Sequence, residues 1–516
     1  MTKQLRAVIF ALCMTLLVTA VIVIAVYILP ANFIIDLRGD TVRYIDLAYG
    51  FSAELPVNMS YDYSLYENRI CCNDDTVSFT VSRENAGVYE VHEYVAYYLD
   101  RFFDSEEYRA ANGITLISRD RCDGYDLTVI SLGDAPDGAY TTYAYVTVYT
   151  SGSRFYRTLI RSYGYTDEVA DIIDRYVSSF FTFGSLGRVK NSFTTKHSYP
   201  SHLDDATKST YETLYSGQHF GIYAEDIENT GINYTVPDIE LKCGYDFPVV
   251  LDYVHLNSAF PADFMQRMYS RGKTVELTYQ LTDSNNSELF GKSTLLDVYC
   301  GNRDDDIRAF ARAAAEFGHP FIFRLCNEMN SDWTSYSGVV NLCDPDIYVS
   351  VWRRIYEIFA EENVTNAIWV FNPNDVDYPP CCWNTYLAYY PGDEYVDIIG
   401  LTGYNTGTYY SEVTGERWRG FDEIYGNLCS EYAGYFADYP WMITEFGCSS
   451  YGGDKAAWID DMFDRIASYD NIHIAVWFCA CDYDTSQGGR VPARDYRLTT
   501  DNDVTTAFKN GIEKFK

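Results

Sequence analysis

Eight short apolar segments alternate with amphipathic segments between residues 213 and 516, and this order predicts a (β/α)8 barrel as the main fold. Two further features complete the predicted architecture. A long uncharged stretch lies near the N-terminus, and a region of alternating strands and helices separates it from the barrel. The expected fold class is therefore α/β: a (β/α)8 TIM barrel preceded by a transmembrane helix and a smaller α+β domain, an antiparallel sheet with helices.

The uncharged stretch covers residues 7–29, and its 23 residues are enough to cross the hydrocarbon core of a membrane. Lys3 and Arg6 precede it, so the positive-inside rule places the tail of residues 1–6 in the cytoplasm. We expect an uncleaved signal anchor, which makes the chain a single-pass cell-membrane protein whose domains are extracytoplasmic. Cleavage and secretion is the alternative, although the following residues offer no clear small-x-small site.

The overall charge narrows the range of partners. Lys and Arg number 39 against 73 Asp and Glu, and the net charge of −34 argues against nucleic acid, whose phosphates demand basic residues. Hydrophobic residues make up 47% of the sequence, which is enough for packed cores in two domains. No Cys-x-x-Cys pair occurs and the seven histidines are scattered, so we expect neither a metal site nor a cofactor.

Residues 40–185 have the pattern of a separate α+β accessory domain. Strands are expected over 49–57 and 76–85, a helix over 90–103, a hairpin over 139–163 and a helix over 166–181. Thr166 can cap the last helix. The order of these elements resembles the PsbP-like α/β domains of exported proteins. Residues 186–212 are polar and aperiodic, and they predict a linker to the barrel of residues 213–516.

The barrel prediction depends on continuously apolar strands, as expected for parallel strands that are buried on both faces. The candidate strands are 219–226, 247–256, 274–281, 319–328, 367–375, 396–405, 440–447 and 472–480. The clearest helices between them are 261–271, 304–318, 344–363 and 455–468. A doubly wound open sheet is the alternative, but no glycine-rich phosphate loop follows the first strand.

Two carboxylates lie where the working groups of such a barrel are found, at the C-terminal ends of strands. Asn327 and Glu328 end the fourth candidate strand, and Glu445 ends the seventh. These strands face each other across a barrel, so the two carboxylates can converge. Either Glu alone is best explained as a solvated strand-end charge. As a pair, they are the minimum equipment for hydrolysing a glycosidic bond.

The barrel resembles the clan A glycoside hydrolases, and within them family 26, whose best-known members are β-mannanases. The stretch R-x-x-N-E-M-N-x-x-W, from Arg324 to Trp333, matches the spacing of that family's acid/base signature. Residues 390–405 resemble its sixth-strand segment, and Thr444–Gly447 resembles its nucleophile strand. The resemblance implies that Glu328 is the general acid/base and Glu445 the nucleophile. It also implies a retaining mechanism, with carboxyl groups about 5–5.5 Å apart.

Further binding residues follow from the same resemblance. Glu445 must stay ionised, and Arg324 and Tyr404 are the candidate hydrogen-bond donors to it. Trp477, at the end of strand eight, is expected to form the aromatic floor of the subsite before the cleaved bond, and Trp333 is the matching candidate on the loop after strand four. For any one Trp, core packing is an equal alternative to stacking on a sugar.

Two departures from the family pattern bear on the substrate. Asn327 stands where family 26 mannanases usually have His before the acid/base. Asn-Glu is commoner elsewhere in clan A, where the amide binds the sugar 2-hydroxyl, so β-glucan, xylan and galactan are open alongside β-mannan. In the sixth strand, Thr402 stands where an acidic residue is common. We expect this difference to change the contacts that hold Tyr404 in place more than the chemistry itself.

Three functions are compatible with these features. The leading hypothesis is a membrane-anchored, extracytoplasmic, endo-acting β-glycosidase that binds a polysaccharide or oligosaccharide. The second is a catalytically inactive surface protein that binds glycans, against which the presence of both Glu residues argues. The third is a surface scaffold in which residues 40–185 perform the recognition.

Overall fold

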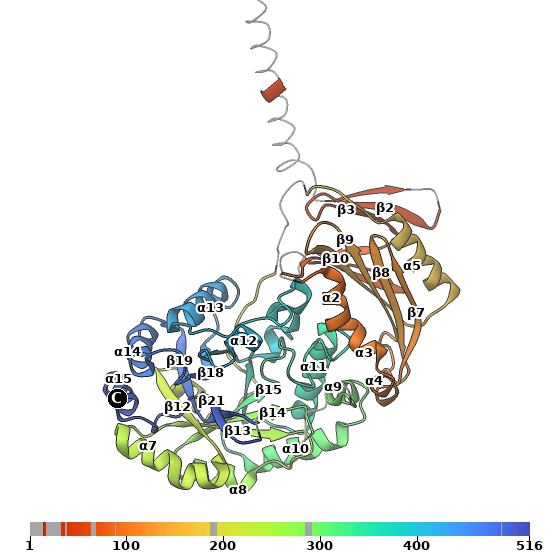
Figure 1. Ribbon diagram of the computed structural model, residues 1–516. Helices are drawn as coiled ribbons and strands as arrows, with labels where there is room; N and C mark the ends of the chain where they lie inside the picture. The colour runs from red at the N-terminus through yellow and green to blue at the C-terminus, as the bar shows by residue number, and fades with distance from the viewer. Residues whose placement is uncertain are drawn as a thin grey trace, which may run out of the picture. The chain divides into compact units, whose positions relative to one another are not determined.

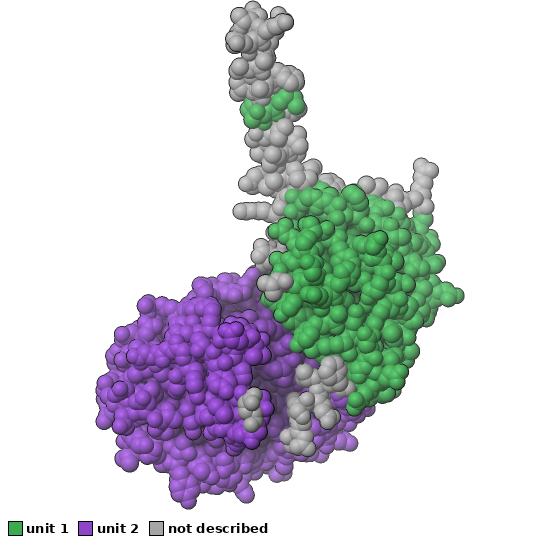
Figure 2. All heavy atoms as spheres, in the orientation of Figure 1, with its two compact units in different colours: residues 1–193, 380–383 green, residues 194–379, 384–516 purple. Residues whose placement is uncertain are grey.

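The computed structural model describes residues 14–16, 32–36, 39–62, 69–87, 89–185, 193–283, 291–486 and 488–515. It divides into two compact units, shown in Figures 1 and 2. Unit 1 comprises residues 1–193 and 380–383, and unit 2 comprises residues 194–379 and 384–516. The predicted membrane segment 7–29 lies outside the described residues apart from a helical turn at 14–16. Within the described part of the chain, no helix has both the length and the apolar character needed to span a membrane.

Unit 2 contains the closed parallel barrel that the sequence predicts (Figure 1). Its eight strands, in barrel order, are β12 (His219–Ala224), β13 (Val249–His255), β14 (Thr274–Gln280), β15 (Phe321–Leu325), β16 (Ala367–Phe371), β17 (Ile398–Asn405), β18 (Trp441–Cys448) and β19 (Ile472–Cys479). All eight predicted strands are confirmed. The sequence located them because each one is buried on both faces and therefore apolar throughout.

Helices surround the barrel on its outer side (Figure 1). The four predicted ones are α8 (Ala262–Ser270), α10 (Asp304–Phe317), α11 (Pro345–Glu361) and α14 (Lys455–Ile466). The others are α6 (Asp205–Leu214), the π-helix η2 (Ile227–Thr235), α7 (Val236–Cys243), α9 (Thr294–Tyr299), α12 (Ser411–Thr414), α13 (Phe421–Tyr435) and α15 (Asn502–Ile512). A two-stranded ribbon, β20 (Cys481–Asp484) and β21 (Val491–Asp495), follows the last barrel strand.

One end of the barrel is filled by apolar side chains. Val249, Ile322 and Ile474 lie near the starts of their strands and belong to one buried cluster with other inward-facing residues. Tyr211 and Leu214 of α6 pack into the same cluster. The prediction of a linker over 186–212 is therefore wrong for α6, which is an amphipathic helix that closes the N-terminal end of the barrel. The working end is the opposite one, where the strands finish.

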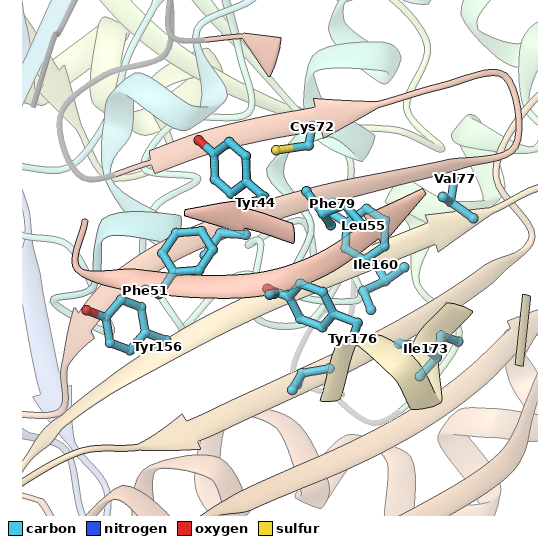
Figure 3. Packing of buried hydrophobic residues seen from close by; sticks show 14 of the residues in the cluster. Tyr44, Phe51, Leu55, Cys72, Val77, Phe79, Tyr156, Ile160, Ile173 and Tyr176 are labelled. Atoms are coloured by element: carbon cyan, nitrogen blue, oxygen red, sulfur yellow. The ribbon is translucent and has the colours of Figure 1, made fainter. Parts of the chain in front are cut away.

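Unit 1 has the predicted antiparallel strands with helices, but they form two sheets and not one. The smaller has the order β1 (Asn32–Asp36), β2 (Thr41–Asp46), β3 (Phe51–Pro56), β11 (Phe181–Thr182). The larger has the order β4 (Ser60–Asp62), β5 (Arg69–Asn73), β6 (Val77–Asn85), β10 (Arg154–Ser162), β9 (Thr142–Tyr149), β8 (Tyr125–Leu132), β7 (Ile114–Cys122). Helix α5 (Asp167–Ser179) contributes Ile173 and Tyr176 to the core in Figure 3. Thr166 Oγ1 caps it, accepting a hydrogen bond of 3.2 Å from the Val169 amide.

Two details of unit 1 differ from the prediction. The helix expected over 90–103 is interrupted. It consists of α2 (Val91–Val95), the π-helical turn η1 (Ala96–Asp100) and α3 (Arg101–Asp104), and the short α4 (Glu106–Ala111) follows.

The unit also includes residues 380–383, which the sequence-based boundary of 40–185 left out. Trp383 Nε1 donates a 2.7 Å hydrogen bond to Tyr94 Oη, and the backbone amide of Trp383 donates to Glu84. A buried polar anchor therefore holds this distant segment in the unit.

Candidate active site

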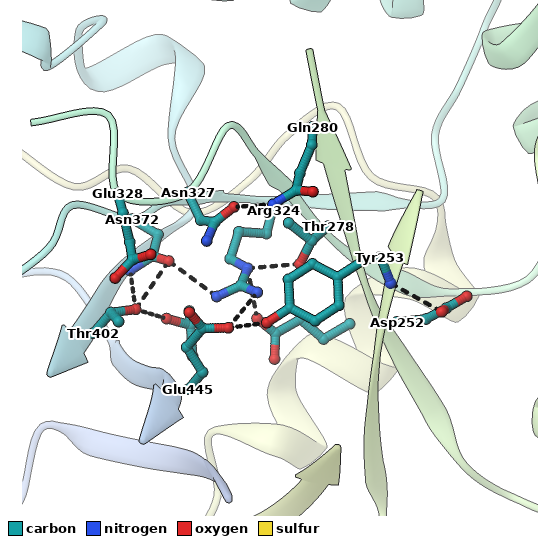
Figure 4. Close-up of polar contacts among 12 residues, drawn as sticks. Asp252, Tyr253, Thr278, Gln280, Arg324, Asn327, Glu328, Asn372, Thr402 and Glu445 are labelled. Carbon is teal, nitrogen blue, oxygen red and sulfur yellow. Dashed lines mark hydrogen bonds and ion pairs between the residues drawn. The ribbon is translucent and has the colours of Figure 1, made fainter. Parts of the chain in front are cut away.

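The backbone directly after β15 places Glu328 in an unusual turn at the open end of the barrel (Figure 4). Cys326 and Glu328 both have positive φ, +47° and +58°. Left-handed backbone is costly for residues with a Cβ and persists only where the surroundings fix it. The Cys326 amide donates to the Tyr279 carbonyl at 3.0 Å, and the Glu328 amide donates to the Asn372 carbonyl at 2.8 Å. The two neighbouring strands thus hold the turn that presents the Glu328 side chain.

The surroundings of Glu328 favour its protonated form. Burial, followed by the nearby charge of Glu445, raises the pKa of Glu328 to about 8. Three groups act in the opposite direction: Asn374, whose Nδ2 donates to Glu328 Oε1 at 2.5 Å, the Arg324 guanidinium and the Trp333 indole. At neutral pH the side chain therefore carries a proton that it can donate.

Glu445 lies in β18 at a local irregularity of the sheet. The pairing with β17 passes from Leu401–Ile443 to Thr402–Glu445, so Thr444 has no partner in the register. Met442 is in the apolar core inside the barrel. Strict alternation would point Thr444 inward and Glu445 outward. The bulge corrects the direction of Glu445, which is a known use of bulges beside active sites.

Glu445 is buried, and its Oε2 accepts hydrogen bonds from two donors. Arg324 Nη2 donates at 3.1 Å, and the Tyr253 hydroxyl is the second donor. Burial and the charge of Glu445 raise the pKa of Tyr253 well above its usual range, so this hydroxyl keeps its proton. Sequence reasoning predicted the Arg324 contact and missed Tyr253, although the alternation of β13 points residues 249, 251 and 253 into the barrel.

Arg324 connects several strands at the centre of the barrel. It is completely buried, and its Nε donates to Thr278 Oγ1 at 2.7 Å while its Nη1 donates to Asn372 Oδ1 at 3.1 Å. Asn372 is in turn hydrogen-bonded to Thr402 of β17. The guanidinium is therefore fixed in direction before any substrate binds.

Asn327 is oriented by two hydrogen bonds to its amide oxygen. Gln280 Nε2 donates to Asn327 Oδ1 at 3.2 Å, and the Tyr336 hydroxyl donates to the same oxygen at 3.0 Å. In this arrangement both partners donate, so the oxygen of the Asn327 amide faces Gln280 and Tyr336. The Nδ2 group is left to serve as a hydrogen-bond donor next to Glu328.

The tyrosine predicted as a second donor to Glu445 has a different environment. Among the residues that the structure describes, no hydrogen bond joins Tyr404 to Glu445. The Tyr404 ring instead lies 4.9 Å from the ring of Tyr496 and 5.9 Å from that of Phe478. Tyr253 takes the predicted role, from the opposite side of the barrel.

The prediction that Trp477 forms the floor of a sugar subsite is also wrong. Trp477 has 0% exposure and packs against Phe446, Trp458 and Phe508, on the helical side of the strand. Its neighbour Phe478 faces the barrel interior, where it stacks on Tyr223 at 4.7 Å. Neighbouring residues of a strand point to opposite faces, which is why Trp477 and Phe478 differ in this way.

Trp333 lies where the sequence placed it, on the loop after β15. It is 46% exposed, and its ring centroid is 5.5 Å from that of Tyr378, which is also exposed. The two rings form an apolar surface beside Glu328. In the described residues, no group of three His, Cys, Asp or Glu side chains is arranged to hold a metal ion.

Comparison with known proteins shows which family this part of the chain resembles. Residues 283–426, which include the turn of Glu328, match the model of Glycosyl hydrolase family 26. Over these residues the barrel is similar to that family. The family 26 match ends before Glu445, so the second carboxylate is assigned by its geometry and not by the matched region.

The curated relatives are named either as an endoglucanase or as mannan endo-1,4-beta-mannosidases. Endoglucanase H of Acetivibrio thermocellus is 29% identical over 278 residues, which cover 51% of this chain and 27% of that protein. The mannan endo-1,4-beta-mannosidase of Bacillus subtilis strain 168 is 32% identical over 94 residues, 17% of this chain and 24% of that enzyme. The chain thus spans about a quarter of the length of these two relatives.

Solved structures of the same family are similar at lower identity. The catalytic domain of an endo-beta-1,4-mannanase from Bacillus sp. JAMB-750 has a TM-score of 0.45 at 18% identity, covering 62% of this chain and 92% of that one. A β-mannanase from Bacteroides ovatus has a TM-score of 0.43 at 16% identity, covering 60% and 92%.

The hydroxyl of Tyr253 gives a first testable prediction. Replacing Tyr253 by Phe removes one of the two donors to Glu445 and should lower kcat about 10- to 100-fold, because a hydrogen bond to a charged group contributes roughly 1.5–3 kcal/mol. The measurement is steady-state kinetics of glycan hydrolysis. Tyr425→Phe is the matched control, since its buried hydroxyl donates to the Gly403 carbonyl. Equal rates for wild type and Tyr253→Phe would exclude a role for this donor.

Proposed function

We propose that the protein is a retaining endo-β-glycosidase that hydrolyses a β-linked polysaccharide. The observation that carries the proposal is the contrast between two neighbouring carboxyl groups. Glu328 has a pKa raised to about 8 by burial and by Glu445, whereas Glu445 forms an ion pair with Arg324. One carboxyl group that holds its proton and one that is paired with a cation fit the acid and the nucleophile of such an enzyme.

In the first step, a carboxylate oxygen of Glu445 attacks the anomeric carbon and the glycosidic C–O bond breaks. Glu328 delivers its proton to the departing oxygen, so the leaving sugar departs as a neutral alcohol. The electron pair of the broken bond remains on that oxygen, and a covalent glycosyl ester to Glu445 remains on the enzyme.

In the second step, Glu328 is ionised and acts as a base. It removes a proton from a water molecule, whose oxygen attacks the anomeric carbon and breaks the ester bond to Glu445. Glu445 leaves as a carboxylate, which its contacts with Arg324 and the Tyr253 hydroxyl stabilise. Two displacements at the same carbon return the β configuration.

For the substrate, we propose a β-glucan, with mannan and xylan as the competing possibilities. The match to the endoglucanase extends over 278 residues, whereas the matches to the mannosidases extend over 93, 94 and 99. Asn327 Nδ2 is directed as a donor by its two oxygen contacts and can bind a sugar hydroxyl next to the acid. Incubation with a panel of soluble β-glucan, mannan and xylan, with reducing-end product analysis, tests both the sugar and the endo action.

The location is also part of the proposal. Residues 7–29 would anchor the chain in the cell membrane, with the barrel on the extracytoplasmic side and the tail of residues 1–6 in the cytoplasm. After expression of the full chain, we expect it in the membrane fraction, and we expect protease added to intact spheroplasts to digest the barrel. A chain lacking residues 1–30 is the control and should be soluble. Recovery of the full chain in the cytosol would refute the anchor.

The catalytic roles predict distinct behaviour for two substitutions. Glu328→Gln and Glu445→Gln should each reduce kcat by at least about 10³-fold, because each removes a group that bonds to the reacting atoms. Glu316→Gln, on the exposed face of α10, is the control and should leave kcat unchanged. Azide should restore hydrolysis of an activated substrate by Glu328→Gly with a β-glycosyl azide as product, and by Glu445→Gly with an α-glycosyl azide. Full activity in either Gln variant would contradict the assignment.

The pKa of Glu328 predicts the alkaline side of the pH profile. Because the acid must be protonated, kcat/KM should fall as pH rises through about 8. Asn374 lowers the pKa of Glu328 by donating to its carboxylate, so Asn374→Ala should move this alkaline limb to higher pH. A movement to lower pH would show that a different group controls the limb.

A further inference from the structure

A third carboxyl group lies inside the barrel, next to the guanidinium that binds the nucleophile. Glu276, Thr278 and Gln280 are alternate residues of β14, and Thr278 and Gln280 bond to Arg324 and Asn327. Alternation therefore also directs Glu276 into the barrel, closer to its N-terminal end than Thr278. Its Oε1 is 3.2 Å from Arg324 Nε, and its side chain has 0% exposure. The mechanism described above does not use it.

Glu276 has an electrostatic contact with Arg324 but a poor hydrogen-bonding environment. Within the described residues, neither of its carboxyl oxygens has a hydrogen-bond partner. Arg324 directs its Nε hydrogen toward Thr278 Oγ1 at 2.7 Å instead. Burying an ionised carboxylate without hydrogen-bond donors costs free energy. Such a group normally takes up a proton unless an opposite charge is paired with it alone.

The groups that face Glu276 show that the charge of Arg324 is shared with a second carboxyl group. Arg324 of β15 also pairs with Glu445 of β18 at 3.1 Å, so one guanidinium lies between two carboxyl groups. The Tyr253 ring of β13 lies 5.4 Å from the guanidinium carbon, and the Tyr215 hydroxyl, directly after α6, is uncharged because burial raises its pKa. Burial raises the pKa of Glu276 to about 8, with Arg324 opposing and Glu445 reinforcing the shift.

We propose that Glu276 is a positioning residue that acts through Arg324: as a neutral acid it leaves the guanidinium charge to Glu445, and as a carboxylate it competes for that charge. The working form of the site then has one ion pair, Arg324 with Glu445, and two protonated carboxyl groups, Glu276 and Glu328. Ionisation of Glu276 draws Arg324 toward β14 and weakens the contact that orients Glu445 for attack in the first step and stabilises it as it departs in the second.

This inference predicts a signature in stability that does not depend on activity. A carboxyl group has a pKa of about 4.3 when unfolded, and that of Glu276 is about 8 in the folded chain. Between these values the folded state binds one more proton, so the group's contribution to stability is lost as pH rises from about 4.3 to about 8. Glu276→Gln removes this dependence. Its Tm relative to wild type should therefore rise steadily from pH 5 to pH 8.

The kinetic test rests on the proposed glycosidase function. If both Glu276 and Glu328 must be protonated, the slope of log kcat/KM against pH should approach −2 above pH 8 in wild type and −1 in Glu276→Gln. At pH 6, kcat and KM of the variant should stay within about threefold of wild type, because Gln reproduces the neutral acid. Glu276→Met, a second neutral residue of similar volume, should behave alike.

Asp252→Asn is the matched control for the kinetic test. Asp252 is also buried with its pKa raised to about 7, but it lies on β13 and makes no contact with Arg324 among the described residues. Its variant should keep the wild-type slope of −2. A pH-independent Tm difference for Glu276→Gln, or a kcat loss above about tenfold at pH 6, would overturn the inference. If no variant and no wild type hydrolysed any glycan, the proposed function would fail and the Tm series would still decide the state of Glu276.

Discussion

The buried ion pair between Arg324 and Glu445 is the interaction on which the site depends. Breaking a buried pair by removing one partner typically costs about 3–5 kcal/mol, because it leaves an uncompensated charge. Here the cation is also held by Thr278 and Asn372, so its direction is fixed by strands β14 and β16. The charge of the Glu445 carboxylate is the second cause, after burial, of the raised pKa of Glu328. One contact thus contributes to the states of both carboxyl groups.

Backbone geometry at two places positions the carboxyl groups of Glu328 and Glu445. Positive φ at Cys326 and Glu328 turns the acid toward the barrel axis, and the bulge at Thr444 turns Glu445 inward. The turn lies directly after β15, and the bulge lies within β18, after the core residue Met442. The apolar interior, closed at the other end by α6, supplies a rigid base for them. The strained backbone at Cys326 and Glu328 thus serves to place the acid.

Much of this arrangement could be predicted from the sequence, for identifiable reasons. The eight strands are apolar on both faces, so their positions are visible in a plain hydropathy pattern. Glu328 and Glu445 were found because each follows or ends such a strand. The α6 helix was missed because its polar face dominates its composition, and only Tyr211 and Leu214 show that it is amphipathic.

The misassigned residues share one physical cause. Trp477 was chosen instead of Phe478 because the sequence does not reveal which face of a doubly apolar strand points inward. Tyr253 was missed because a single polar atom in an otherwise apolar strand has no distinctive pattern. Glu445 shows the reverse case, since simple alternation from Met442 would have pointed it outward. Register and bulges are set by tertiary contacts, which the local sequence does not contain.

The most direct test of the central claim is the capture of the covalent intermediate. A 2-deoxy-2-fluoro glycoside of a β-glucan disaccharide with an activated leaving group should form a stable ester, because the fluorine slows the second displacement more than the activated first one. Intact-mass spectrometry of the treated protein should show one added disaccharide, and peptide mapping should locate it on Glu445. A protein that turns over glycans without forming any adduct, or that carries the label on another residue, would contradict the assignment of Glu445 as the nucleophile.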